Sequence, residues 1–174
     1  MRLTPVMRKY VLHWGEMGAR WGVNRSVAQI HALLWLSDGP LHAEEIAETL
    51  GVARSNVSTS LKELQGWNLV RLTHLPGDRR DHFEARHDPW DMLVTIIEGR
   101  KRREIDPTLE MLRLCADEAE LDPETPISVK ARLRGMQTFM EQVNGWYEQM
   151  RHVPRPTLIK LVSLGAKVSS LIGR

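Results

Sequence analysis

Short polar and basic side chains gather on one face of a segment near the middle of the chain. Over residues 53–66, apolar Val57, Leu61 and Leu64 recur at helical spacing, which predicts an amphipathic helix. The opposite face carries Arg54, Ser55, Asn56, Ser58, Thr59 and Lys62. Short hydroxyl and amide groups can reach base edges in a major groove, and basic groups can reach phosphates or guanine. This segment is therefore predicted to be a DNA recognition helix.

A second basic group follows in a predicted hairpin. Residues 69–75 and 82–87 have the composition and alternation of two strands, and residues 76–81 between them are typical of a turn. That turn carries Arg79 and Arg80, which suit contact with phosphates or with a minor groove. A short helix over residues 42–51, which ends at Gly51, precedes the recognition helix. The order helix, turn, helix and hairpin predicts a winged helix-turn-helix over residues 25–88.

The same pattern has two other interpretations. The polar helix face can simply be solvated, or the winged helix can be a protein-interaction module that does not bind DNA directly. The adjacent cations Arg79 and Arg80 favour double-stranded DNA, because a wing that binds protein has no need of them. DNA affinity that falls steeply with salt would separate these hypotheses.

Helices are predicted on both sides of this block. Residues 1–24 contain an apolar stripe at spacings of three and four, which predicts an amphipathic helix that needs a helical partner. Residues 89–174 are predicted to be helical, with a restart at Asp106–Pro107 and a clear seam between 127 and 150. That seam comprises Val129, Leu133, Met136, Met140, Val143, Tyr147 and Met150. A last amphipathic helix is predicted from Leu158, Leu161, Val162, Val168 and Ile172. The spacing leaves open whether these seams pack within one chain or between two.

The middle block resembles the MarR superfamily of transcriptional regulators. The resemblance is carried by residues 44–51, 55–58 and 61–64, and by Asp78 and Arg80, which match that superfamily's Asp-x-Arg wing signature. Residues 77–85 and 88–92 are similar to the GbsR-type branch, whose members include repressors tied to glycine betaine, choline and osmoprotectant genes. Ala85–Arg86 stands where the superfamily usually has Leu-Thr, which favours that branch.

The resemblance, which covers about residues 1–150, implies a mainly α fold with a small β-hairpin. It implies a winged helix-turn-helix flanked by dimerisation helices within residues 1–24 and 89–174. It also implies a homodimeric repressor on a roughly palindromic operator, with DNA contacts from recognition helix 53–66 and wing 76–81. A small effector is a further hypothesis, because aromatic faces can hold a quaternary ammonium group. The candidate residues, which can equally be core filler, are Trp14, Trp21, Trp35 and Trp90.

Other chemistry finds little support in the sequence. The chain has no glycine-rich phosphate loop and no nucleophile elbow, so neither an enzyme nor a bound cofactor is predicted. His74, His82 and His87 lack the spacing of metal ligands, and no metal is predicted. The one cysteine, Cys115, excludes an internal disulfide and is expected to be a buried apolar thiol. The basic run 100–103 is expected to be a solvated face.

Composition and length set the broad class. The 174 residues carry 24 basic and 22 acidic side chains, a net charge of +2, so the location of charge rather than its total must indicate nucleic acid. No apolar run approaches the roughly 20 residues that span a bilayer. Charge appears too early in the N-terminal segment for a signal peptide, so no membrane association and a cytoplasmic location are expected.

Overall fold

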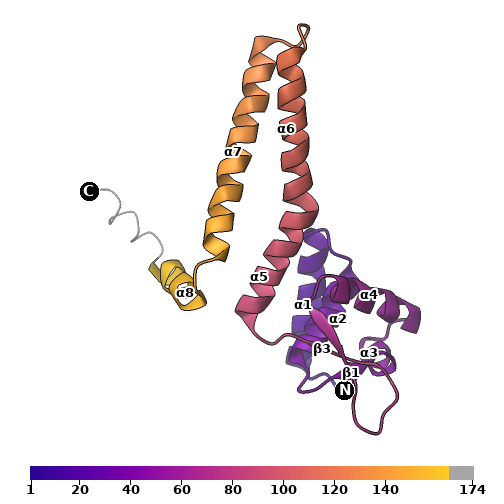
Figure 1. The fold of residues 1–174 in the computed structure, drawn as a ribbon. Coiled ribbons are helices and arrows are strands. Elements are labelled where there is room, and N and C mark those ends of the chain that lie inside the picture. Colours follow the sequence, from indigo (N-terminus) through magenta and orange to yellow (C-terminus); the bar gives the residue numbers. More distant parts are fainter. Residues whose placement is uncertain (165–174) are drawn as a thin grey trace. The chain divides into compact units, whose positions relative to one another are not determined.

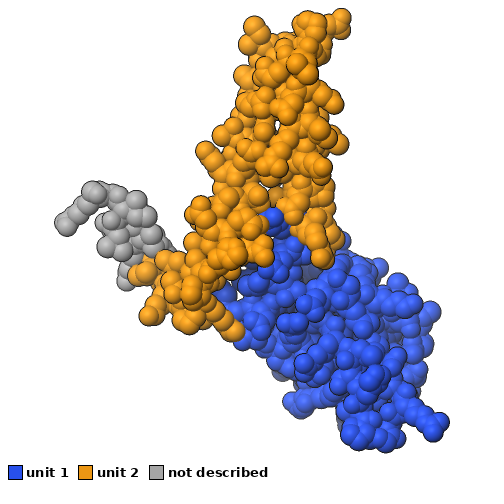
Figure 2. Space-filling view, viewed as in Figure 1, with its two compact units in different colours: residues 1–101 blue, residues 102–174 orange. Residues whose placement is uncertain are grey.

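The computed structural model describes residues 1–164, which form α-helices, one π-helical turn and a three-stranded antiparallel sheet (Figure 1). The chain divides into two compact units, Met1–Lys101 and Arg102 onward (Figure 2). The predicted mainly α fold with a winged helix is confirmed. Val168 and Ile172, which were predicted to extend the last helix, lie outside the described residues.

Unit 1 begins with two helices that pack closely. Helix α1 (Pro5–Arg20) has Thr4 as its cap, and α2 (Arg25–Leu36) has Asn24, whose Oδ1 accepts from the Ser26 amide at 2.8 Å. A Cβ added at Gly18 would lie 2.5 Å from the Ala28 Cβ, so glycine lets the two backbones approach. The close pairing anchors α1 to the winged unit.

The winged block follows in the expected order. Helix α3 (Ala43–Leu50) ends at Gly51, whose φ of +67° is the left-handed conformation of a helix C-cap. Helix α4 (Arg54–Gly66) leads to strands β2 (Val70–Thr73) and β3 (His82–Ala85). The two strands pair antiparallel, with Leu72 opposite Phe83, and are shorter than the sequence predicted. The loop between them projects as a wing (Figure 1).

A third strand was not predicted. Strand β1 (Leu41–His42) pairs antiparallel with β3, so the sheet order is β1-β3-β2. The sequence placed His42 in the following helix, but its backbone is extended and its side chain caps α3. This short strand ties the start of α3 to the base of the wing.

The core of unit 1 lies between α2, α3, α4 and the sheet. Its most deeply buried side chains include Ile30, Leu33, Ile46, Leu61 and Leu64, each at most 2% exposed. Burial of each such side chain contributes about 1.5–3 kcal/mol. The core therefore fixes how α4 is oriented against the rest of the unit.

Helix α5 (Pro89–Arg100) extends the same unit, and Met92 and Ile96 pack against its core. Asp88 caps α5, and its Oδ1 accepts from the Trp90 amide at 2.8 Å. A π-helical turn, η1 (Lys101–Ile105), then precedes α6 (Asp106–Leu121). Pro107 lacks an amide N–H and crowds the carbonyl four residues earlier, which favours this wider turn over a regular helix.

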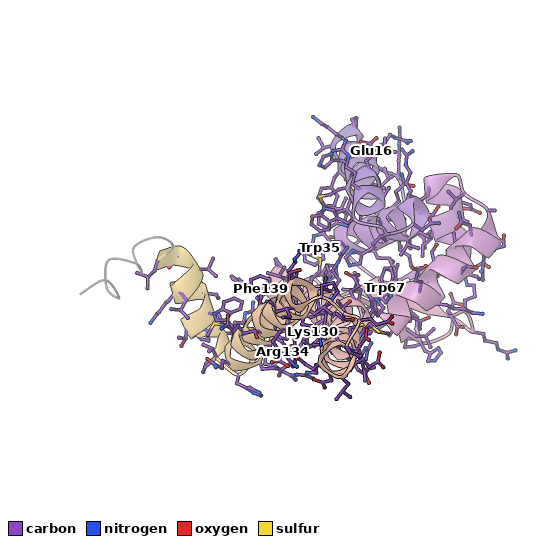
Figure 3. All side chains as sticks on the ribbon, turned by 90° about the horizontal axis from the view of Figure 1, so that it is seen from above. Glu16, Trp35, Trp67, Lys130, Arg134 and Phe139 are labelled. Carbon is purple, nitrogen blue, oxygen red and sulfur yellow. The ribbon has the colours of Figure 1, made fainter. Side chains whose placement is uncertain are left out.

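Unit 2 contains α6 packed along α7 (Ile127–Arg151), followed by α8 (Arg155–Leu164). Ion pairs join α6 and α7, among them Arg113 Nε to Glu141 Oε1 at 2.8 Å. Phe139 lies on the side of α7 away from Lys130, whose Nζ donates to a carbonyl at the end of α6 (Figure 3).

Cys115 is half-buried, not fully buried as expected. None of the described helices is both long and apolar enough to span a membrane.

A buried histidine in α2 makes unit 1 sensitive to acid. His31 is only 4% exposed, and its Nε2 has no hydrogen-bond partner among the described residues. Burial lowers the pKa of His31 from 6.5 to about 4. Between these values the unfolded chain binds a proton that the folded chain does not, so folding stability is lost as pH falls through this window.

We expect the free energy of unfolding to fall by up to roughly 3 kcal/mol between pH 6.5 and pH 4 because of this one group. Urea unfolding at a series of pH values measures it. His31→Leu should flatten the dependence in this window, whereas His13→Leu, at an exposed position, should leave it unchanged. An unaltered dependence in His31→Leu would contradict the assignment.

Candidate nucleic-acid interface

The recognition helix predicted at residues 53–66 corresponds to α4, which begins at Arg54. Its apolar face is buried at Val57, Leu61 and Leu64. Ser55, Thr59 and Lys62 are exposed, and the Thr59 hydroxyl donates back to the Ser55 carbonyl at 3.2 Å. These three residues form the outer face, which presents two hydroxyls and one ammonium group to solvent.

Asn56 lies differently from the other predicted contact residues. Its Nδ2 donates to Ser26 Oγ at 2.9 Å, and its Oδ1 accepts from Ser60 Oγ at 3.4 Å. The amide thereby joins α4 to the first turn of α2. Asn56 is placed to orient the recognition helix, because its amide group is already used inside the unit.

Arg54 and Ser58 are also engaged within the chain. Arg54 Nε donates to Glu44 Oε1 at 2.7 Å, and Arg54 Nη1 donates to Ser58 Oγ at 2.5 Å. The hydrogen bond from Arg54, ahead of those from the Glu44 backbone and His42, lowers the pKa of Glu44 to about 2. Arg54 therefore starts from a neutralised ion pair, and Glu44 stays ionised at all physiological pH values.

The wing is shaped by the two residues that match the Asp-x-Arg signature. Asp78 Oδ1 accepts from the Arg80 backbone amide at 3.0 Å and from Arg80 Nε at 2.9 Å, and Oδ2 accepts from Arg80 Nη2 at 2.5 Å. These bonds hold the pKa of Asp78 far below its ordinary range and raise that of Arg80. Arg79 between them is exposed, with no partner among the described residues. The wing thus holds one arginine and displays the other.

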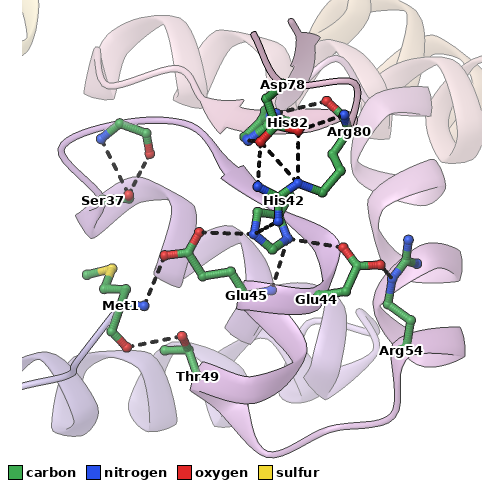
Figure 4. A network of polar contacts seen from close by, with 11 residues as sticks. Met1, Ser37, His42, Glu44, Glu45, Thr49, Arg54, Asp78, Arg80 and His82 are labelled. Atoms are coloured by element: carbon green, nitrogen blue, oxygen red, sulfur yellow. Dashed lines mark hydrogen bonds and ion pairs between the residues drawn. The ribbon is translucent and has the colours of Figure 1, made fainter. Parts of the chain in front are cut away.

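Contacts extend from the wing to the recognition helix (Figure 4). Arg80 Nη1 lies 2.9 Å from His42 Nε2, and His42 Nδ1 lies 3.0 Å from Glu44 Oε2. Glu44 in turn binds Arg54 at the start of α4. The sequence analysis included Glu44 only in the run that carries the family resemblance, and it assigned no role to His42. Their position just before the recognition helix is the one signal that could have suggested a role.

A hollow of about 300 Å³ lies between α3, α4 and the hairpin. Lys62 and Arg80 are among the residues that line it, together with the apolar Leu72 and Phe83. One concave surface therefore joins cations from both predicted DNA-contacting elements.

The four tryptophans proposed for an effector site do not share ring contacts with one another. The ring of Trp14 stacks on that of Tyr10 with centroids 5.5 Å apart, and the ring centroid of Trp35 lies 5.9 Å from that of His87. Trp21 is exposed, and Trp90 follows the α5 cap. None of the four pairs with another in the ring contacts of residues 1–164. The quaternary ammonium site stays a prediction from composition and resemblance.

One residue of the basic run 100–103 has a defined contact in unit 1. Arg100, the first residue of the basic run, donates from Nη2 to the Trp21 carbonyl at 2.6 Å, at the C-terminal end of α1. A cation there is favourable for the helix dipole.

No cluster of three or more His, Cys, Asp or Glu side chains able to hold a metal occurs within the described residues.

The helix pair α3–α4, the three-stranded sheet and the projecting hairpin define a winged helix-turn-helix protein. Residues 19–81 match the family model described as the MarR family. Together with the relatives below, this match supports a transcriptional regulator of the MarR superfamily.

Two relatives come from Bacillus subtilis (strain 168). YvaV, named as an HTH-type transcriptional regulator, is 19% identical over 152 residues, which cover 78% of this chain and 85% of YvaV. The HTH-type transcriptional repressor GbsR is 26% identical over 102 residues, and the match spans 59% of this chain but only about half of GbsR, 54%.

A solved structure shares the fold. The crystal structure of a transcriptional regulator superposes with a TM-score of 0.68 at 18% sequence identity, covering 84% of this chain and 95% of that one. At this identity the likeness concerns the fold alone.

The position of Asn56 generates a stability prediction. Asn56→Ala removes the link to Ser26 and leaves partly buried hydroxyl groups without a partner, so we expect a loss of about 1–2 kcal/mol in the free energy of unfolding. Urea unfolding measures it. Gln65→Ala, at an exposed site of the same helix, is the matched control and should change stability by less than about 0.5 kcal/mol. Equal effects of the two substitutions would show that Asn56 does not anchor α4.

Proposed function

We propose that the protein is a homodimeric repressor that binds a roughly palindromic operator through α4 and the wing. The observation that carries this proposal is the exposure of Ser55, Thr59 and Lys62 beside a wing that displays Arg79. The rigid helix offers short groups suited to base edges, and the wing tip offers a cation suited to phosphates or a minor groove. The repressor role draws support from the name of the relative GbsR.

The dimer draws support from unit 2. Helix α7 has 25 residues and not one fully buried side chain in the described structure. Met136, Phe139, Val143 and Trp146 recur at spacings of three and four and are 45–62% exposed. An apolar stripe of this kind marks an interaction site, and a second copy of the chain is the partner that a palindromic operator requires. A two-fold dimer would present two α4 helices about one DNA turn apart.

Regulation by a small effector belongs to the same hypothesis. An effector that binds one spacing of the two winged units more tightly than another would shift the dimer away from DNA. A quaternary ammonium osmoprotectant is the candidate class, by resemblance to the GbsR-type branch. Release of bound DNA on addition of choline or betaine tests it.

The wing arginines generate the first test of DNA binding. Arg79→Ala should weaken binding to DNA from upstream of the protein's own gene and lower the salt slope by about one for each wing that contacts a phosphate. Fluorescence anisotropy over a salt series measures both. Arg80→Ala should weaken binding as well, because it also releases the Asp78 turn.

Arg151→Ala serves as the control, since Arg151 pairs with Glu148 at the end of α7, far along the chain from the wing. Its salt slope should match that of the unsubstituted protein. A folded dimer that fails to bind the DNA at low salt would overturn the proposal and favour a protein-interaction module.

The exposed stripe of α7 generates a separate prediction. The double substitution Phe139→Asp and Trp146→Asp should shift the dimer toward monomers, because it buries charge in the proposed interface. Sedimentation equilibrium at micromolar concentration measures the shift, and circular dichroism confirms that the helices persist. Gln149→Asp, at an exposed polar site of α7, should leave the dimer intact. An unchanged dimer in the double variant would place the interface elsewhere.

A further inference from the structure

His42 sits where β1 meets α3 and contacts charged groups from more than one element (Figure 4). Its Nε2 lies 2.9 Å from Arg80 Nη1, and its Nδ1 lies 3.0 Å from Glu44 Oε2. Its ring meets His82 of β3 edge-on, with centroids 5.6 Å apart. The side chain is only 16% exposed, so these partners hold it in a defined place.

We propose that His42 is a positioning residue that holds the wing in a fixed relation to the recognition helix. On one side the imidazole binds Arg80, which Asp78 fixes within the wing turn. On the other side it binds Glu44, whose second oxygen accepts from Arg54 at the start of α4. The imidazole is thus the link between two ion pairs. The inference rests on the proposed function, since it concerns how the two DNA-contacting elements act together.

The partners also dictate where the ring carries its proton. A guanidinium group has only donors, so His42 Nε2 must accept from Arg80. The proton of a neutral ring then lies on Nδ1 and is donated to Glu44 Oε2. The Glu45 amide lies 3.3 Å from the same Nδ1 and can donate to it only when that nitrogen is unprotonated, so this capping bond and the bond donated to Glu44 exclude each other.

A second proton would break this arrangement. It would place an N–H on Nε2 against the Arg80 guanidinium at 2.9 Å, so that two cations would face each other. Glu44 and Glu45 of α3 attract a protonated ring, whereas Arg80 of the wing and a charged His82 of β3 oppose it. Arg54, Asp78 and the terminal ammonium of Met1 form the outer layer, each paired with one of these groups. Only a neutral ring therefore accepts from Arg80 and keeps the link intact.

The free protein provides the first test. Hydrogen exchange at the Asp78 and Arg80 amides reports on the wing turn, because these amides donate to Leu75 O and Asp78 Oδ1. His42→Phe keeps a ring but removes the acceptor, and exchange should rise about five- to tenfold. His42→Gln, which can place an acceptor oxygen near the site of Nε2, should restore most of the protection. His74→Phe, at an exposed histidine of the same hairpin, should have no effect.

Rescue by the conservative variant separates positioning from simple packing. His42→Phe and His42→Gln both fill the site, but only His42→Gln supplies an acceptor for Arg80. Equal exchange in His42→Phe and the unsubstituted protein, or equal exchange in His42→Gln and His42→Phe, would overturn the proposal.

DNA binding gives the functional readout. His42→Phe should reduce the affinity ratio between the operator and random DNA by about tenfold, with an unchanged salt slope because no cation is removed. If the unsubstituted protein binds no DNA, the proposed function fails, while the exchange experiment still decides the role of His42. Operator discrimination that survives intact in His42→Phe would show that the link does not serve DNA recognition.

Discussion

Burial of the apolar face of α4 sets which side chains of this helix face solvent, and the rest of the proposed DNA-binding surface is arranged around it. Val57, Leu61 and Leu64 pack in the core of unit 1, and a helix is stiff, so its opposite face must point outward at fixed angles. Ser55 and Lys62 are displayed for this reason, without contacts of their own. Hydrophobic burial, which is independent of any DNA sequence, therefore decides which side chains of α4 would be available to contact DNA.

The polar contacts fix the orientation of the wing turn and of Arg54 more than they stabilise the fold. The Asp78–Arg80 and Glu44–Arg54 pairs are exposed, and exposed ion pairs contribute little to folding. Their geometry is nevertheless restrictive, because Asp78 binds both the backbone and the guanidinium of Arg80 and so closes the wing turn. The Asp-x-Arg signature has a local physical meaning here: the acid folds the turn, and the residue between the two displays its side chain.

Helical periodicity predicted the helices, and the alternation of residues 69–87 predicted the hairpin, because both patterns are local. The hydrogen bond of Asn56 to Ser26 could not be predicted from local pattern, because the two residues are thirty positions apart. His42 was assigned to a helix, since its pairing with β3 is likewise a contact across the fold.

The apolar seam predicted in α7 shows that helical spacing alone does not predict which apolar side chains are buried. Alternating spacings of three and four identify a stripe but not its width. In the structure Leu133 and Met140 are half-buried, whereas Met136 and Val143 lie exposed beside Phe139 on another side of the helix. Two narrower stripes were thus merged into one. A second stripe on a helix that already packs against α6 is what an additional partner would require.

The net charge of only +2 is accompanied by few free cations on the surface proposed to bind DNA. Arg54 and Arg80 are held by carboxylates in the free protein, which leaves Arg79 and Lys62 as exposed cations of the wing and of α4. If Arg54 or Arg80 binds a phosphate instead of its carboxylate, it exchanges one anionic partner for another. The released carboxylate of Glu44 or Asp78 must then be solvated by water. The carboxylates thus make binding to any phosphate less favourable, and the proper placement of both elements becomes more important for tight binding. An interface with few free cations depends on geometry for its affinity, and that geometry is set by the core under α4 and by the contacts at the base of the wing.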